Sequence, residues 1–157
     1  MTSMVTAPGT QHDRLASPWQ ARVMAEYRGQ CLCGAVRYVI EADAPQAMYL
    51  CHCSRCRRET GTLYGATVFF GGGALRFDSG EQDLTAYSLP GTRKTRQFCK
   101  ICGSPMPRIE PRGTVALPAG SLDDSSLVAP TAHIHCDSEA VWADAAALAP
   151  RLGGLPG

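Results

Sequence analysis

Short apolar runs, alternating or continuous and separated by turn-forming residues, dominate the middle of the chain. The runs that predict strands cover residues 34–41, 66–70, 74–77, 84–89, 95–98, 106–109, 114–120 and 132–136. Glycines 71–73 end the second run, and Asp78-Ser79-Gly80 is a typical turn composition. One helical segment of one or two turns is predicted over residues 54–60. The pattern has neither an internal repeat nor a regular alternation of strands and helices, so it predicts a mainly β fold of mostly antiparallel sheets with little helix.

The patterning is weak at both ends of the chain. Residues 1–25 are rich in Thr, Ser, Pro, Gln and Ala and predict a flexible leader, or a true start of translation at Met24. Residues 26–148 carry the strand pattern and predict the ordered domain, and residues 149–157 predict a flexible tail. A length of 157 residues fits one domain with tails.

Charge and hydropathy exclude two classes of partner. Fifteen basic and fourteen acidic residues give a formal net charge of +1, which is too balanced for electrostatic binding to nucleic acid or to an anionic membrane. The most apolar stretch, residues 63–75, contains four glycines and is shorter than the ~20 residues of a bilayer span. Residues 1–23 lack the apolar core of a signal peptide, so we expect a cytoplasmic protein with reduced thiols.

Eight cysteines are the strongest chemical signal in the sequence, and seven of them fall into three groups. These are a first pair (Cys31 and Cys33), a triplet (Cys51, Cys53 and Cys56) and a last pair (Cys99 and Cys102), while Cys136 stands alone. In a reducing compartment, clustered thiols hold metal more often than they form disulfides. The last pair has the spacing of half a zinc knuckle, because two intervening residues let both sulfurs converge on one ion. The spacing therefore predicts bound Zn²⁺.

The spacing alone leaves the grouping of these cysteines open. If the first pair joins the last pair, four thiolates close one structural zinc, and the triplet holds a second zinc with a vacant fourth position. Alternatively, Cys53 and Cys56 join the last pair, and Cys51 is left with the first pair. We favour the first arrangement because it keeps each local group intact. Cys136 is a further candidate, since as a fourth ligand of the triplet it would make that site structural.

An open site with three thiolates favours thiol chemistry. Three thiolates and Zn²⁺ leave a net charge of −1, which makes the ion a poor activator of water but still a good binder of sulfur. A substrate thiol could fill the vacant position and have its pKa lowered there. Such a thiol, if anionic, needs cations nearby, and the three arginines beside the triplet (Arg55, Arg57 and Arg58) are candidate substrate contacts, with a solvated surface as the alternative. A second basic group, Arg93, Lys94 and Arg96, precedes the last pair.

Three histidines are candidates for proton transfer. His52 lies between two cysteines of the triplet and is a candidate catalytic acid or base, although a packed or surface role is the alternative. His133 and His135 are predicted to share one face of a strand, because side chains two residues apart in a strand point the same way. Either of them could donate a proton.

The ordered cysteine motifs closely resemble those of a known family, the glutathione-dependent formaldehyde-activating enzymes, also called the centromere protein V family. The motifs are Cys31-x-Cys33-Gly34-x-Val36-Arg37, Cys51-His52-Cys53-x-x-Cys56-Arg57-x-x-x-Gly61 and Phe98-Cys99-x-x-Cys102-Gly103-Ser104, followed by His133-Ile134 and Trp142. The resemblance implies a β-tent of antiparallel sheets around two zinc sites. By motif position, Cys31, Cys33, Cys99 and Cys102 would be the structural ligands, and Cys51, Cys53 and Cys56 would hold the catalytic zinc.

The resemblance also implies a reaction. Members of the family are named for joining formaldehyde to glutathione, which gives S-(hydroxymethyl)glutathione and is formally a carbon–sulfur lyase reaction in reverse. The partners implied are a small-molecule thiol such as glutathione and a small aldehyde. Charge and hydropathy already predict no nucleic-acid partner and no membrane. The competing hypothesis is a non-catalytic module stapled by zinc that binds a partner. A vacant position on the second zinc favours the enzyme.

Overall fold

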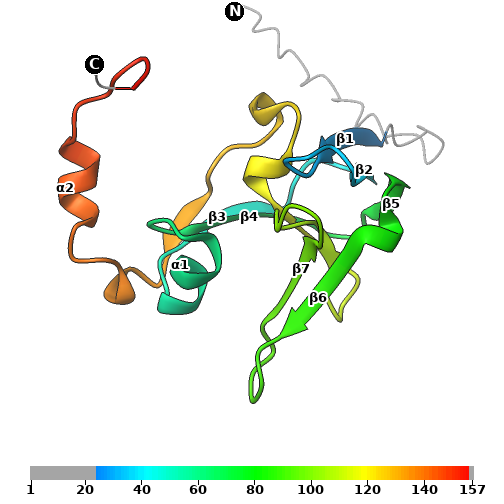
Figure 1. Cartoon of the computed structure of the whole chain (residues 1–157), viewed down its shortest axis with the longest axis horizontal. Coiled ribbons are helices and arrows are strands. Elements are labelled where there is room, and N and C mark those ends of the chain that lie inside the picture. The colour runs from blue at the N-terminus through cyan, green and yellow to red at the C-terminus, as the bar shows by residue number, and fades with distance from the viewer. Residues whose placement is uncertain (1–23, 156–157) are drawn as a thin grey trace, which may run out of the picture.

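The structure, a computed structural model, describes residues 24–155 and consists mainly of short strands (Figure 1). The strands are β1 (Ala25–Gln30), β2 (Arg37–Ala42), β3 (Ala47–Cys51), β4 (Gly65–Phe70), β5 (Ala74–Ser79), β6 (Leu84–Ser88), β7 (Thr95–Cys99), β8 (Arg108–Ile109), β9 (Val115–Pro118) and β10 (Ala132–Ile134). The α-helices are α1 (Ser54–Thr60) and α2 (Ala143–Leu148). Within residues 24–155, neither helix has the length and apolar character needed to cross a membrane. The predicted mainly β class is confirmed.

The strands form three small sheets. One has the order β1-β2-β5, the second has the order β10-β3-β4-β9-β8, and the third is the β6-β7 pair. Neighbouring strands run antiparallel except β10 and β3, which are parallel. This one parallel pair brings the segment after β10 to the same edge of the sheet as Cys51, the last residue of β3.

A single core lies between the first two sheets. Its largest fully buried side chains come from the central strands β2, β4 and β9 and from the segment before β8 and include Tyr38, Ile40, Phe70, Leu117 and Met106. Burying a side chain of this size contributes roughly 1.5–3 kcal/mol. Cys31 and Cys99 belong to the same buried cluster, so the core extends to the ends of the strands that carry cysteines.

Two strands and one helix were absent from the sequence prediction. β1 alternates correctly, with Tyr27 and Gly29 buried, but it has one large apolar residue and a glycine where a strand pattern needs side chains. Gly29 is required there, because an added Cβ would lie 2.2 Å from the Tyr38 hydroxyl. β3 is equally short of β-branched residues. α2 lies in the weakly patterned region near the C-terminus and stands apart from the sheets (Figure 1).

The prediction of a strand over residues 132–136 was wrong at its C-terminal end. β10 ends at Ile134, because His135 adopts the left-handed conformation with φ of 57° and turns the chain into a 3₁₀ turn over Cys136–Ser138. His133 and His135 therefore do not share a strand face, and this expectation is corrected.

The helix predicted over residues 54–60 coincides with α1. It ends at Gly61, whose φ of 68° lets its N–H donate to the Arg57 carbonyl in the usual left-handed C-cap. Of the leader predicted over residues 1–25, residues 1–23 lie outside the described residues, and Ala25 already opens β1.

Candidate metal centres and an adjoining cationic pocket

The strand ends and turns gather seven cysteines into two groups. Within each group the sulfur atoms lie within 4.8 Å of one another. The four-cysteine group is Cys31, Cys33, Cys99 and Cys102, and the three-cysteine group is Cys51, Cys53 and Cys56. The alternative pairing of Cys53 and Cys56 with the last pair is not the arrangement in the structure. Cys136 is exposed and belongs to neither group.

Two similar turns build the four-cysteine group. Cys31 follows β1 and its carbonyl accepts from the Gly34 N–H at 3.0 Å, while Cys99 ends β7 and its carbonyl accepts from the Gly103 N–H at 2.8 Å. Both glycines have φ near 75°, at 73° and 75°, a conformation that residues with a Cβ rarely adopt. The chain therefore folds back within four residues in the first turn and five in the second, and each turn presents two sulfurs to the shared group.

Hydrogen bonds lock the two turns together. The Leu32 N–H donates to the Ser104 hydroxyl at 3.0 Å, which joins residues 72 positions apart in the sequence. The same hydroxyl lies 3.3 Å from the Cys102 sulfur, and the Val36 N–H donates to the Cys31 sulfur at 3.3 Å. The Ser104 hydroxyl and backbone N–H lower the pKa of Cys102 to about 5. This turn thus stabilises a thiolate, the form that binds metal.

The spacing of the sulfurs fits one tetrahedral ion. Metal–sulfur bonds of about 2.3 Å in a tetrahedron place the sulfurs roughly 3.8 Å apart. The Cys31 and Cys33 sulfurs are 3.4 Å apart, and the whole group lies within 4.8 Å. The backbone N–H of Ala35 lowers the pKa of Cys33, but the Cys31 thiol and burial outweigh it and raise this pKa to about 12.

The three-cysteine group lies where β3 meets α1. Cys51 ends β3, Cys53 is the N-cap of α1, and Cys56 lies in its first turn. Burial raises the pKa of Cys53, but the backbone N–H groups of Cys56 and Arg55 and the neighbouring thiols outweigh burial and lower it. Free N–H groups at a helix start are the physical reason. All three cysteines are partly exposed, unlike Cys31 and Cys99.

The number of ligands separates the two groups. In the described part of the chain, no fourth cysteine, histidine or carboxylate lies close enough to join the three sulfurs. A tetrahedral ion held there would keep one position for an exogenous ligand, whereas four sulfurs complete the shell in the other group. Either group could hold a metal ion, and only the three-cysteine group could expose one to a substrate.

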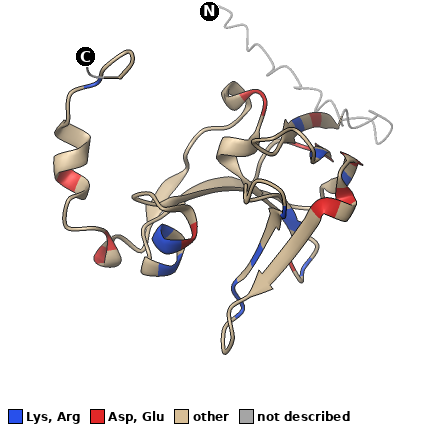
Figure 2. Ribbon diagram, in the orientation of Figure 1, with Lys and Arg blue, Asp and Glu red and all other residues tan. Residues whose placement is uncertain are grey.

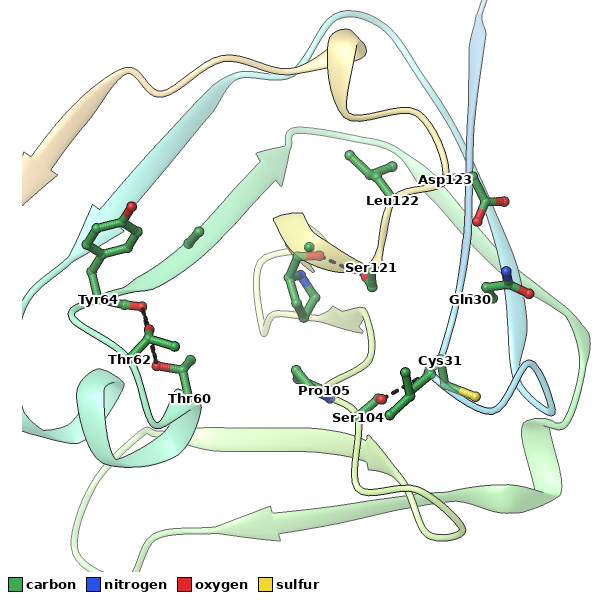
Figure 3. A pocket seen from close by; sticks show the side chains of 14 residues that line it. Gln30, Cys31, Thr60, Thr62, Tyr64, Ser104, Pro105, Ser121, Leu122 and Asp123 are labelled. Carbon is green, nitrogen blue, oxygen red and sulfur yellow. Dashed lines mark hydrogen bonds between the residues drawn. The ribbon is translucent and has the colours of Figure 1, made fainter. Parts of the chain in front are cut away.

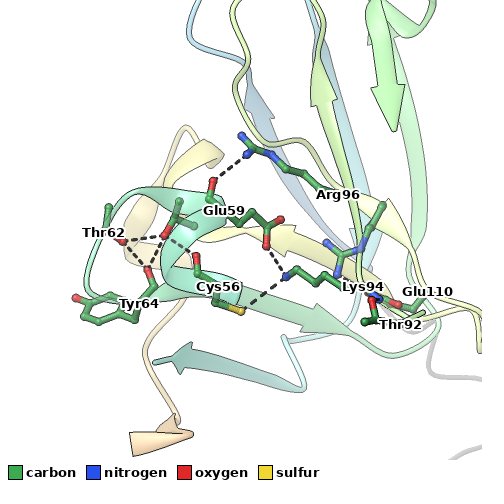
Figure 4. Close-up of polar contacts among 10 residues, drawn as sticks. Cys56, Glu59, Thr62, Tyr64, Thr92, Lys94, Arg96 and Glu110 are labelled. Atoms are coloured by element: carbon green, nitrogen blue, oxygen red, sulfur yellow. Dashed lines mark hydrogen bonds and ion pairs between the residues drawn. The ribbon is translucent and has the colours of Figure 1, made fainter. Parts of the chain in front are cut away.

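A lysine and a glutamate flank the open group (Figure 4). Lys94 Nζ lies 3.7 Å from the Cys56 sulfur and forms an ion pair with the Glu59 carboxylate of α1. Burial lowers the pKa of Lys94, but the hydrogen bond and charge of Glu59 outweigh burial and raise it. Burial and the Cys51 thiol raise the pKa of Cys56 to about 12 against the opposing charge of Lys94. The open group therefore has a lysine–glutamate ion pair at its edge, with the lysine ammonium nearest the Cys56 sulfur.

A cationic pocket of about 310 Å³ lies beside this ion pair. Four cations and one carboxylate from α1 and the β6–β7 hairpin border it, and Tyr87 and Leu89 add apolar contacts. The charged residues are Arg55, Arg58, Lys94, Arg96 and Glu59. Basic residues on α1 and on the β6–β7 hairpin are visible in Figure 2. Of the three arginines predicted as substrate contacts, Arg57 does not border this pocket, because its guanidinium donates to the His52 and Ser138 carbonyls, each at 3.1 Å.

His52 lies in a second polar cluster. Its side chain is only 6% exposed, and Nε2 lies 2.8 Å from Nδ1 of His133 on β10. The other ring nitrogen, Nδ1, lies 3.6 Å from the Glu139 carboxylate, and the Tyr64 ring packs beside both histidines. His52 is thus connected to exposed His133. Its role as an acid or base remains a prediction.

A larger pocket of about 770 Å³ opens between the α1–β4 loop and the turns after β1 and β9 (Figure 3). Thr62, Tyr64, Ser104 and Ser121 are among the residues that line it, and Cys31 borders it. Sequence reasoning missed this pocket and also Glu59 in the cationic pocket. No local pattern could have revealed them, since both depend on contacts between distant segments.

Comparison with known proteins finds a matching family, a similar sequence and a similar solved structure. Residues 26–138 match the model of the family described as glutathione-dependent formaldehyde-activating enzyme. Over 115 residues the chain is 30% identical to a Halomonas elongata protein provisionally named as such an enzyme, covering 68% of this chain and 71% of that protein. A crystal structure of a Rhodobacter sphaeroides protein matches with a TM-score of 0.51 and 23% identity, covering 68% of this chain and 98% of the other, and it shares the fold.

Proposed function

Because the chain belongs to the glutathione-dependent formaldehyde-activating enzyme family, we propose that it adds a thiol reversibly to formaldehyde or a related small carbonyl. With glutathione as the thiol, the product is S-(hydroxymethyl)glutathione, and the reverse reaction is that of a carbon–sulfur lyase. The observation that carries the proposal is the three-cysteine group, which is partly exposed and lacks a fourth ligand among the described residues.

We propose zinc for both cysteine groups. All-sulfur tetrahedral sites suit this ion, and the four-cysteine group would hold it as a closed structural site. Cys51, Cys53 and Cys56 would hold the second ion. Zinc bound there would supply a Lewis acid that lowers the pKa of a substrate thiol. The structural site would stabilise the fold, because binding free energy at such a site is folding free energy.

The chain's own residues would support a simple addition. The substrate thiol loses its proton, its sulfur forms a bond to the carbonyl carbon, and the carbonyl π pair moves to oxygen, which takes up a proton. No oxidant or further reactant is needed. Lys94, 3.7 Å from the Cys56 sulfur, would balance the negative charge that an additional thiolate brings. His52 would exchange the proton with solvent through His133, to which it is hydrogen-bonded.

The alternative function is a non-catalytic module in which both zinc ions only stabilise the fold. Two features of the site favour the enzyme over this module. The open group is partly exposed, and a charged pocket adjoins it. We propose a cytoplasmic location, where glutathione keeps thiols reduced.

NMR exchange spectroscopy of glutathione and formaldehyde tests the proposal directly. The zinc-loaded protein should accelerate exchange between free glutathione and its hydroxymethyl adduct above the uncatalysed rate, and Cys136→Ser should behave identically because this cysteine is exposed and outside both groups. Equal exchange rates with and without the wild-type protein would remove the enzymatic function and favour the structural module.

A further inference from the structure

We infer that the cationic pocket binds a carboxylate of the substrate, so that the protein selects carboxylate-bearing peptide thiols over neutral thiols. The inference rests on the proposed function for the identity of the thiol site. It adds a recognition site formed by residues of two elements. Lys94 lies just before β7 and Arg96 lies on it, and Arg55 and Arg58 lie on α1.

The first argument is the unbalanced charge of the pocket. Four cations border it, and Glu59 is the one carboxylate among its bordering residues. Arg55 and Arg58 are exposed and form no hydrogen bond or ion pair with any other residue of 24–155. Charges of one sign around a partly enclosed volume concentrate their field within it and attract a counter-charge. A carboxylate suits an arginine best, because the guanidinium fork can donate two parallel hydrogen bonds to it.

The second argument is the distance between the pocket and the open cysteine group. Lys94 belongs to both, since it borders the pocket and its Nζ lies 3.7 Å from the Cys56 sulfur. One extended residue spans roughly 3.3–3.6 Å. A peptide thiol with its sulfur at the three-cysteine group can therefore reach Lys94, and the pocket that Lys94 borders, with the carboxylate of an adjacent residue. Glutathione has this layout, with a carboxylate-bearing residue on each side of its cysteine.

The third argument is that the hairpin side of the pocket and the backbone of α1 are held in place before a ligand arrives. Arg96 donates to the Glu59 carbonyl at 2.8 Å and to the Gly103 carbonyl at 3.0 Å, which ties α1 to the turn of the four-cysteine group. Arg55 and Arg58 are three residues apart on α1 and so lie on one helix face. Because the scaffold is preorganised, less free energy is lost in ordering it when a ligand binds.

The fourth argument is that size and lining suit part of a small peptide. A volume of about 310 Å³ lies at the lower end of small-ligand pockets. Tyr87 and Leu89 offer apolar surface to the aliphatic part of the ligand, while the cations bind its charged end. A neutral thiol gains only the apolar contact, so the pocket should discriminate by charge.

The test compares glutathione with its diethyl ester, which keeps the thiol but has neither carboxylate. Binding of each to the zinc-loaded protein is measured by calorimetry for the wild type, Arg58→Gln, Arg55→Gln and the control Arg37→Gln. Arg37 is an exposed arginine on β2 that does not border the pocket. Loss of one charge-assisted hydrogen bond should weaken glutathione binding about tenfold in Arg58→Gln. The affinity of Arg58→Gln for the diester, and the affinity of Arg37→Gln for glutathione, should equal those of the wild type.

S-methylglutathione separates this inference from the proposed reaction, because it keeps both carboxylates but has no free thiol. It should bind the wild type, and Arg58→Gln should weaken that binding about tenfold. Equal wild-type affinity for glutathione and its diester, or equal weakening of both by Arg55→Gln and Arg58→Gln, would overturn the inference. Normal S-methylglutathione binding without any acceleration of thiol exchange would instead overturn the reaction and support the carboxylate site.

Discussion

The two cysteine groups use the same side chain, but only the four-cysteine group has members that are buried. In the four-cysteine group, Cys31 is 3% and Cys99 is 0% exposed, and both are part of the hydrophobic core. In the three-cysteine group every member is partly exposed, and the neighbours are Lys94 and a charged pocket. A complete ligand set that is anchored in the core by two of its members favours stability, whereas an incomplete set beside a pocket favours chemistry. The chemical role thus depends on ligand number and burial more than on ligand type.

The largest effect is expected from removing a buried ligand of the closed group. Cys99→Ser should abolish cooperative unfolding, because a structural zinc site contributes about 10–16 kcal/mol in small zinc domains and whole domains have only about 5–15 kcal/mol of stability. Circular dichroism during thermal unfolding measures this. Cys136→Ser is the control, since that cysteine is exposed and outside both groups. A Cys99→Ser variant with a normal melting transition and two zinc ions would contradict the structural assignment.

The same substitution in the open group should have a different result. Cys53→Ser should lower the zinc content from two ions per chain to one and reduce thiol exchange to the uncatalysed rate, while the fold loses only about 1–2 kcal/mol. Native mass spectrometry counts the ions, and denaturant unfolding measures the stability. If Cys53→Ser unfolded the protein as completely as Cys99→Ser, the distinction between the groups would be lost.

A smaller effect is expected from the ion pair at the edge of the open group. Glu59→Gln should cost about 1–2 kcal/mol of unfolding free energy, because the Glu59 and Lys94 side chains are only 16% and 28% exposed and the lysine would lose its partner. Glu26→Gln is the matched control, since its ion pair with Arg28 is about half exposed and should contribute less. Equal costs for the two variants would show that burial does not strengthen the Glu59–Lys94 pair.

Particular residues explain which features of the fold and of the cysteine groups could be predicted from the sequence. The local cysteine pairs and triplet, α1 and strands such as β4 and β7 follow from local spacing and periodicity. Spacing alone did not decide that the first and last pairs join in one group. β1 was missed because Gly29, needed for the contact with Tyr38, weakens the strand pattern. The end of β10 was misplaced because nothing in the local pattern marks the positive φ of His135. Lys94 and Cys56, 38 residues apart, meet only through the tertiary fold, so the cationic pocket was beyond local reasoning.

The smallest effect is expected at the hydroxyl that links the two turns of the closed group. Ser104→Ala removes the acceptor of the Leu32 N–H and the contact to the Cys102 sulfur, and it should cost about 1 kcal/mol. Chemical denaturation measures the loss, and thiol exchange should keep its wild-type rate because the open group is untouched. A change in exchange rate without a change in stability would mean that the two groups are not independent.

Anomalous diffraction at the zinc absorption edge, from crystals grown with and without glutathione, tests the central distinction most directly. The account predicts two ions per chain, one bound by Cys31, Cys33, Cys99 and Cys102 and the other by Cys51, Cys53 and Cys56 with a fourth ligand from outside the chain. In the glutathione crystals that fourth ligand should be its sulfur. A single ion, or two ions each fully ligated by the polypeptide, would contradict the account.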